Sequence, residues 1–471
     1  MLETIVYYLN VFFFVYMFLY ALVFFTTTLT ASLRLDDFFV RKRYMSYAML
    51  SNDRNYIPVS ILVPAFNEEI TIIDTVESLL NLKYTEYEIV VINDGSEDNT
   101  SQVLIDRFGL KQVARPARLS VPCNEIINVY ENMDKVRITL VNKKNGGKAD
   151  ALNAGINICR FPLFACIDAD SMLQDDSIRI VAEPFLENDD TIAVGGNIKI
   201  SNDVIIENGQ VVETNIPKKP IILFQMIEYL RVFLASRVAL NSINGNLIIS
   251  GAFGLYKKAA AINVGGYTPG VIGEDMEIIV KMHAFYRKNK IPYMIYYAPD
   301  AICWTQAPEK LSVLRRQRRR WHEGMGQSLG SHMFMFFNPH YGTVGTVAFP
   351  YFVLFEYITP ILEVAGIVTI VLSYFLGLLN VQFFIMYLLI YMGFSMIVSL
   401  ISLLLDRYIF PTHSTPRLTA KLVLFAFLES FGYRQFCSLC RLGAFIGFNK
   451  NQWGKMERTQ NRKREDQPEE S

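Results

Sequence analysis

Residues 140–171 constrain the fold of this chain more than any other segment. They read as a short apolar run, a glycine-rich turn with Lys148, a segment of helix-forming composition, and a second apolar run that ends on Asp168 and Asp170. This order predicts strand, turn, helix and strand. In open α/β sheets ligands bind beyond the carboxyl ends of strands, so the lysine and the two acids should face one crevice. A lysine with flexible glycines suits a phosphate and two nearby acids suit a divalent cation, which indicates a site for a metal and a diphosphate.

Strand and helix patterns alternate before this segment. An apolar strand at residues 59–63 precedes an amphipathic helix at 70–82, and a second strand at 87–92 precedes a second helix at 99–108. This alternation predicts a parallel sheet with right-handed crossovers.

Two stretches depart from the alternation within what we take as one domain, residues 59–308. Residues 109–135 form an excursion in which we expect one extra strand at 126–130. Residues 201–220 contain an Asn-Gly pair between apolar pairs, which predicts a hairpin.

The composition indicates a membrane protein, because 51% of the residues are hydrophobic and only 19% are charged, and the apolar excess sits in a few blocks. Residues 5–29 are almost free of charge and long enough to span a bilayer. No basic segment precedes them and no small-residue cleavage site follows, so they do not read as a signal peptide. The basic residues that follow are Arg34, Arg41, Lys42 and Arg43. The positive-inside rule therefore predicts an N-terminus outside the cell membrane and a cytosolic domain.

Two segments read as amphipathic helices at the membrane interface rather than spans. Residues 221–240 are apolar with polar residues at a spacing of three, and residues 310–333 carry an apolar stripe beside arginines. The expected stripe consists of Leu311, Leu314, Trp321, Met325 and Leu329.

From residue 344 to 448 the chain returns to membrane composition. We expect one span within 358–378 and a second at 381–405. Residues 418–448 contain charges, and a third single crossing would place the basic tail outside, so we interpret them as a bent hairpin or a span with a re-entrant piece. The chain is therefore divided into a membrane helix 1–34, a linker 35–58, a domain 59–308, an interfacial helix 309–341, a membrane region 342–448 and a charged cytosolic tail 449–471.

Three further acids stand where a site is expected. Asp94 follows the second strand in N-D-G-S, a sequence that is also ordinary turn chemistry. Glu274 and Asp275 stand at the start of a helical pattern, where capping would explain them equally well. The functional alternative is a general base that takes a proton from a hydroxyl group. A solvated turn is likewise the alternative for Asp168 and Asp170.

The helix at residues 310–333 places Gln317, Arg320 and Trp321 on one face, at spacings of three and four. Trp321 could stack on a sugar while the polar pair contacts phosphate. The neighbouring arginines could bind anionic lipid at the same time. Nucleic acid is excluded as a partner, because the net charge is zero and membrane segments bracket the helix. The small residues from Ser250 to Gly254 would let a bulky chain approach, or mark a simple bulge.

The motifs P-A-F-N-E-E, N-D-G-S, G-G-K-A-D-A-L-N, D-A-D, S-G-A-F-G, G-E-D and Q-R-R-R-W occur in the order found in the processive family 2 glycosyltransferases, which this chain resembles over residues 59–329. That family includes the cellulose, chitin, hyaluronan and poly-N-acetylglucosamine synthases. The resemblance implies an α/β GT-A domain between transmembrane helices. It also implies inverting transfer from a UDP-sugar, with UDP-N-acetylglucosamine as one candidate, to a growing polysaccharide that is extruded.

The resemblance also implies a role for each motif residue. The donor would be bound by Ala65, Phe66, Asn67, Glu68, Asp94, Lys148, Gln317 and Arg320. The acceptor would be held by Ser250, Gly251 and Trp321. The cation, Mg²⁺ or Mn²⁺, would be held by Asp168 and Asp170, with Asp170 favoured. The base would be Asp275, with Glu274 beside it.

Some features leave alternatives open. Gly273 stands where many members have threonine, and the two departures from the alternation look like inserts. No regulatory domain follows the membrane region, which argues against cyclic-dinucleotide control, and the layout most resembles poly-N-acetylglucosamine synthase. Glu356, Glu363 and Glu429 could line a path for the product, and accessory export subunits are possible partners besides membrane lipids. A single-addition transferase with a lipid-linked acceptor and a non-catalytic transporter or scaffold are the competing functions.

Overall fold

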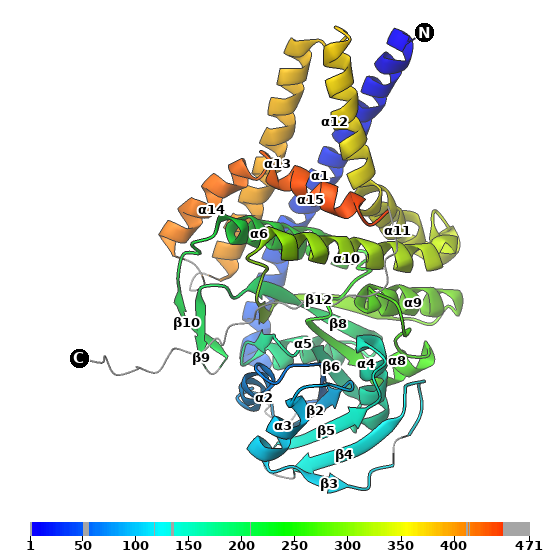
Figure 1. Cartoon of the computed structure of the whole chain (residues 1–471), viewed down its shortest axis with the longest axis vertical. Coiled ribbons are helices and arrows are strands. Elements are labelled where there is room, and N and C mark those ends of the chain that lie inside the picture. The colour runs from blue at the N-terminus through cyan, green and yellow to red at the C-terminus, as the bar shows by residue number, and fades with distance from the viewer. Residues whose placement is uncertain are drawn as a thin grey trace, which may run out of the picture.

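The computed structural model describes residues 2–49, 56–116, 118–132, 136–207, 209–410, 413 and 415–445. In this part of the chain a ten-stranded mixed sheet forms the centre of the molecule, with the strand order β3-β4-β5-β2-β1-β6-β11-β8-β12-β7 (Figure 1). Its strands are β1 Val59–Ala65, β2 Tyr87–Asn93, β3 Lys111–Val113, β4 Ile126–Asn132, β5 Arg137–Lys143, β6 Leu163–Ile167, β7 Met172–Leu173, β8 Thr191–Ile200, β11 Phe253–Lys257 and β12 Met294–Thr305.

The strands β5, β2, β1 and β6 are parallel neighbours, which confirms the predicted alternation. The strands β1, β2 and β6 are mostly apolar and buried on both faces, as parallel strands covered by helices are. One face packs on α2, α3 and α5 and the other on α4, α8 and α9. These helices are α2 Ile72–Leu80, α3 Thr100–Phe108, α4 Lys148–Ile158, α5 Ser177–Glu187, α8 Lys258–Asn263 and α9 Glu274–Lys288.

The second half of the sheet is mixed. β11 lies antiparallel between β6 and β8, and β12 runs parallel to β8. The extra strand predicted in the excursion is confirmed as β4, whereas its edge partner β3 was not predicted. The predicted hairpin is confirmed as β9 Val204–Glu207 and β10 Gln210–Thr214, which form a separate two-stranded sheet. Asn208 of its turn lies outside the described residues.

Three long helices project from one end of the domain (Figure 1): α1 Leu2–Met49, α12 Thr359–Phe375 and α13 Val381–Ile409. By length and hydropathy, candidate spans lie at Glu3–Asp36 and Phe384–Ile409, and a third is the bent pair Val344–Tyr357 and Thr359–Phe375, with a 42° bend. The helix α1 continues beyond its span into the segment expected as a linker. No glycine or proline occurs before Pro58 to end it.

The bent hairpin, or span with a re-entrant piece, that we expected at residues 418–448 is not found in the described part of this segment. The described part of this segment forms α14 Pro416–Leu428 and α15 Tyr433–Leu442, helices of 13 and 10 residues. Both are shorter than the roughly 17–25 residues that a span needs. They lie across the base of the long helices (Figure 1). The pair α12 and α13 already returns the chain to the side of the domain, so no hairpin is required there.

The first amphipathic helix that we expected is continuous but irregular. It consists of α6 Pro220–Arg231, a π-helical turn at Val232–Ser236 and α7 Arg237–Asn241. The second is α10 Leu311–Ser331, and its stripe is only partly buried: Leu314 and Leu329 are in the core, but Leu311 is 56% exposed and Trp321 45%. The remaining elements are the short helical turns Met333–Met335, Pro339–Tyr341 and Val344–Ala348, then α11 Phe349–Tyr351 and a π-helical turn at Phe352–Tyr357.

The three carboxylates expected along a product path each have a partner in the structure. Glu429 is fully buried and pairs with Arg231 of α6. Glu363 accepts a hydrogen bond from Ser438, and Glu356 accepts one from the Tyr351 hydroxyl at 3.0 Å. Of these contacts, the one between Glu363 of α12 and Ser438 of α15 joins a candidate span to a helix below it.

Candidate active site

The site forms where the strands β1, β2 and β6 end. The backbone N–H of Asp94 donates to the carbonyl of Ala65 at 2.9 Å, so the loops after β1 and β2 begin side by side. Asp168 follows β6, which is the neighbour of β1. The predicted meeting of these motifs at one sheet edge is therefore confirmed by the register of the strands.

Lys148 is the centre of the contacts at this edge. Its Nζ lies 2.5 Å from Asp168 Oδ1, 3.2 Å from Glu274 Oε1 and 3.4 Å from the carbonyl oxygen of Gly251. Burial alone would lower the pKa of Lys148, but the charges of Asp168 and Glu274 outweigh it and raise that pKa. A Cβ at Gly251 would lie 2.8 Å from Lys148 Nζ, so a side chain at this residue would displace the ammonium group from its contacts. Four motifs that are far apart in the sequence thus meet around one ammonium group.

Asp275 lies next to this cluster. It is the second residue of α9, and its Oδ2 accepts a hydrogen bond from the Gly251 N–H at 3.1 Å while its Oδ1 accepts one from Met276 N at 2.9 Å. The carboxylate is therefore held by two backbone donors and is partly exposed. Burial raises the pKa of the neighbouring Glu274, and the Lys148 charge opposes that rise.

Asp170 is half-buried, as Asp168 is. Burial, followed by the negative charge of Asp168, raises the pKa of Asp170 to about 6, while Lys148 and Arg320 lower it. This interaction places Arg320 of α10 within electrostatic reach of the acid pair. Among the described residues, no group of three or more His, Cys, Asp and Glu could hold a metal ion unaided. A divalent cation here would need oxygen ligands from a substrate and from water in addition to the two carboxylates, which is the donor set that Mg²⁺ favours.

Asp94 has a second set of contacts that the sequence did not reveal. Its carboxylate lies 2.5 Å from Lys143 Nζ and accepts hydrogen bonds from Gly146 N and Gly147 N at 3.0 and 2.7 Å. Lys143 is fully buried and lies 2.6 Å from Asp150 as well. Asp94 therefore orders the glycine loop that precedes Lys148. Burial raises the pKa of Asp94, although these donors oppose the rise.

The loop from Ala65 to Glu68 lies beside Asp94 and is fixed by the next loop. Asn67 has a φ of 56°. Its backbone N–H donates to Ser96 Oγ at 2.9 Å, and its Oδ1 accepts from Glu97 N at 2.8 Å. The Phe66 ring is 42% exposed. An exposed ring on a fixed loop at the sheet edge is suited to contact a planar ligand.

The helix α10 carries the Q-R-R-R-W motif. Gln317, Arg320 and Trp321 share a face as predicted, but the structure also shows a buried Arg318 that the sequence did not single out. Its guanidinium lies 4.4 Å from the centre of the Trp321 ring, donates to Gln317 Oε1 at 3.2 Å, and pairs with Glu228 of α6 at 2.8 Å. Arg318 therefore orients Trp321, whose ring remains 45% exposed.

The structure gives a physical reason for the glycine at residue 273, which begins the G-E-D motif. A Cβ at Gly273 would lie 2.9 Å from the backbone of Gly324, and a Cβ at Gly324 would lie 2.7 Å from Gly273. The two glycines let α10 cross directly over the start of α9. A threonine at residue 273 would push α10 away from Asp275.

Residues 57–324 match the family described as glycosyltransferase like family 2. The poly-beta-1,6-N-acetyl-D-glucosamine synthase of Staphylococcus epidermidis is 32% identical over 289 residues, which cover 61% of this chain and 60% of that protein. The synthase of the same name from Staphylococcus aureus strain COL is 32% identical over 307 residues, covering 65% and 62%. The matched region thus spans about three fifths of the length of these relatives. A mannosyltransferase structure from Pyrobaculum calidifontis, in complex with GDP-Man and Mn²⁺, aligns over 87% of this chain and 99% of its own with a TM-score of 0.49 at 15% identity.

Proposed function

The chain belongs to the family 2 glycosyltransferases, and from that premise we propose that it polymerises a β-linked polysaccharide from a UDP-sugar, with UDP-N-acetylglucosamine as the favoured donor. The observation that carries the proposal is the convergence of Lys148, Asp168, Gly251 and Asp275 at one end of the sheet. The GT-A fold and inversion are parts of the same proposal, and the mixed sheet with its parallel half supports the fold. The names of the related synthases support the choice of sugar.

The contacts suggest how the reaction proceeds. The Asp275 carboxylate accepts the proton of the acceptor hydroxyl as that oxygen forms a bond to the anomeric carbon of the donor. The bond from that carbon to the diphosphate breaks on the opposite face, and UDP leaves. Lys148 lies where it can bind the departing diphosphate, and Arg320 is within reach of the same charge. The backbone bonds that fix Asp275 would keep the base in line with the leaving group.

The two acids after β6 fit a role in holding Mg²⁺ or Mn²⁺ together with the diphosphate. Both are carboxylates one residue apart, and Lys148 balances only part of their charge. When bound, the cation would neutralise charge on the leaving diphosphate. Lys148 and Asp168 are in contact, so diphosphate binding would redistribute the partners of both side chains.

The positive charge after the first span supports a membrane orientation with the N-terminus outside. Arg34, Arg41, Lys42 and Arg43 follow the apolar run. The active site would then face the cytosol, where sugar nucleotides are found, and the product would pass outward beside the membrane helices. The helices α6, α10 and α15 would lie at the membrane interface, which their position below the long helices in Figure 1 supports.

A donor panel with and without metal tests the proposal directly. The full chain in lipid nanodiscs with Mg²⁺ or Mn²⁺ should release UDP from a UDP-sugar, most rapidly from UDP-N-acetylglucosamine. Addition of EDTA should lower the rate at least tenfold and weaken UDP binding, and restoring the cation should recover both. If no UDP is released from any donor across the panel, the catalytic proposal is wrong and a non-catalytic scaffold is favoured. Full activity in EDTA would remove the metal from the proposal.

Trp321→Ala tests whether α10 holds the acceptor. The exposed ring is positioned by Arg318 rather than by the acid cluster. We expect the variant to yield shorter or no polymer on gel electrophoresis, with UDP affinity unchanged within twofold. Leu311→Ala, which also changes an exposed side chain on α10, is the matched control and should have wild-type product length. A large loss of UDP affinity would place Trp321 at the donor instead. If the wild type adds only one sugar to its acceptor, a single-addition transferase is favoured over a polymerase.

A further inference from the structure

Glu228 of α6 is a carboxylate that connects three helices and takes no part in the proposed chemical step. Its Oε2 lies 2.8 Å from Arg318 Nη2 of α10, and its Oε1 lies 3.2 Å from Arg441 Nη2 of α15. The hydroxyl of Tyr433, also on α15, donates to Oε2 at 3.0 Å. Both carboxylate oxygens are therefore bound, and the side chain is 14% exposed. The position of Glu228 is thus fixed by partners from two other helices.

The charge of Arg318 has to be compensated from outside its own helix. Arg318 is 1% exposed. The sequence of α10 contains one acid, Glu323, which pairs with Arg319 at 2.9 Å. Because a buried charge without a partner is costly, Glu228 is needed to keep Arg318 in place. The pKa of Glu228 reflects this pairing: burial alone would raise that pKa, but the charges of Arg318 and Arg441 outweigh burial and lower it.

Arg318 in turn limits where the Trp321 ring can lie. Its guanidinium is 4.4 Å from the centre of that ring, which is within the range of a cation–π contact. The ring of Tyr229, the residue after Glu228 on α6, lies on another side, with the two ring centres 6.5 Å apart. Both neighbours of the indole are connected to Glu228, one by an ion pair and one by the chain itself. A change at Glu228 should therefore alter the position of the exposed ring.

The helix α15 supports the same network from the side of the long helices (Figure 1). The Tyr433 ring stacks on Phe224 of α6, with ring centres 4.7 Å apart and planes at 17°. Leu314 of α10 packs with Tyr433 and Cys437 of α15. The helix α15 is thus packed on both α6 and α10 while it contributes a cation and a hydroxyl group to Glu228.

We propose that Glu228 is a positioning residue for the acceptor, which holds Trp321 in its binding orientation through Arg318, and that α15 completes this support. The inference rests on the proposed function, in which Trp321 contacts the acceptor. A ring that is already fixed loses less conformational freedom when a sugar stacks on it, so the acceptor binds more tightly. A network that merely joined the helices would affect stability without a particular effect on Trp321.

Glu228→Gln is the first test, because it removes the charge and keeps the size of the side chain. The full chain in lipid nanodiscs would be supplied with UDP-N-acetylglucosamine and Mg²⁺. A growing chain that dissociates faster is extended fewer times, so we expect product length to fall about tenfold, the effect of losing a desolvated cation–π contact. The KM for the donor should not change. Arg316→Met removes an exposed arginine of the same helix and is the matched control, with wild-type product length.

The double variant with Glu228→Gln and Arg318→Met separates positioning from stability. It removes both buried charges, so its denaturation midpoint should return close to that of the wild type. Trp321 still lacks its cation in this variant, so the product should stay short. If product length recovers together with the midpoint, the network only stabilises the helices and the inference is wrong.

Fluorine NMR of the chain labelled with fluorotryptophan observes the ring without turnover. The Trp321 resonance is assigned by its absence from Trp321→Phe. It should shift in Glu228→Gln while the resonances of the other tryptophans stay in place. Tyr433→Phe removes one bond to Glu228 but keeps the stacked ring, so it should give a smaller shift and decides the question if Glu228→Gln does not fold. An unchanged Trp321 resonance would overturn the inference, whereas a wild type that releases no UDP from any donor would count against the proposed function.

Discussion

Asp275→Asn is expected to reduce sugar transfer by about 10²- to 10⁴-fold, the usual contribution of a general base. The asparagine keeps the size of the side chain and its Oδ1 can still accept the Gly251 N–H bond that Asp275 Oδ2 accepts at 3.1 Å. The variant loses the ability to take a proton and one backbone bond, because the amide nitrogen cannot accept the Met276 N–H bond that Asp275 Oδ1 accepts at 2.9 Å. UDP affinity should therefore stay within twofold of the wild type, because no contact of Lys148 with Asp168 is altered.

Glu274→Gln is the matched comparison, because it changes the adjacent acid in the same way. Glu274 Oε1 lies 3.2 Å from Lys148 Nζ, so its neutralisation would alter the charge around the ammonium group rather than remove a base. We expect a change in the KM for the donor with a smaller loss of kcat. Single-turnover rates and UDP titrations of both variants separate these effects. Retained turnover in Asp275→Asn, or a larger kcat loss in Glu274→Gln, would exchange their roles.

The parts of the fold that were predictable are those in which local pattern and burial agree. The strands β1, β2 and β6 are short apolar runs followed by turn residues, and their motifs meet because parallel strands end at one edge. The helices α14 and α15 were misjudged for the opposite reason. Their composition resembles a span, but a break at Gly432 leaves each too short to cross a membrane.

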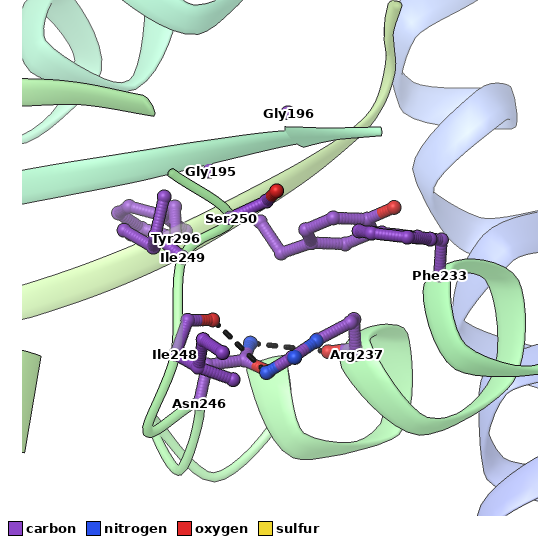
Figure 2. A pocket seen from close by; sticks show the side chains of 10 residues that line it. Gly195, Gly196, Phe233, Arg237, Asn246, Ile248, Ile249, Ser250 and Tyr296 are labelled. Carbon is purple, nitrogen blue, oxygen red and sulfur yellow. Dashed lines mark hydrogen bonds between the residues drawn. The ribbon is translucent and has the colours of Figure 1, made fainter. Parts of the chain in front are cut away.

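The features of the site that the sequence did not predict depend on contacts between residues that are far apart in the chain. The sequence does not distinguish Arg318 from the other arginines of its helix, and only its contact with Glu228, 90 residues away, shows that it is buried and orients Trp321. The need for a glycine at residue 273 becomes apparent only from its close backbone contact with Gly324 of α10. A small cavity beside Ser250 (Figure 2) is lined by residues of β8, β12 and a helical segment that are far apart in the chain, and no periodicity of the sequence predicts their contact.

Lys143→Met is expected to have the largest effect on stability, a loss of about 3–5 kcal/mol, because it leaves buried charges without a partner. Lys143 Nζ lies 2.5 Å from Asp94 and 2.6 Å from Asp150, and all three side chains are at most 5% exposed. Asp94 in turn accepts the N–H groups of the glycine loop before Lys148. Loss of the ammonium group should therefore disorder this loop and abolish donor binding as well as lower the denaturation midpoint.

Lys144→Met provides the matched control on the next residue. Lys144 pairs with Glu125 at 2.6 Å, but both side chains are 66% exposed, and exposed pairs contribute little. Its denaturation midpoint and UDP affinity should equal those of the wild type. The double variant with Lys143→Met and Asp150→Asn should recover part of the stability, because one uncompensated carboxylate is neutralised. If Lys143→Met is as stable as Lys144→Met and binds UDP normally, the buried lysine does not hold the glycine loop. The predicted role of Asp94 in binding the nucleotide would then not depend on its pair with Lys143.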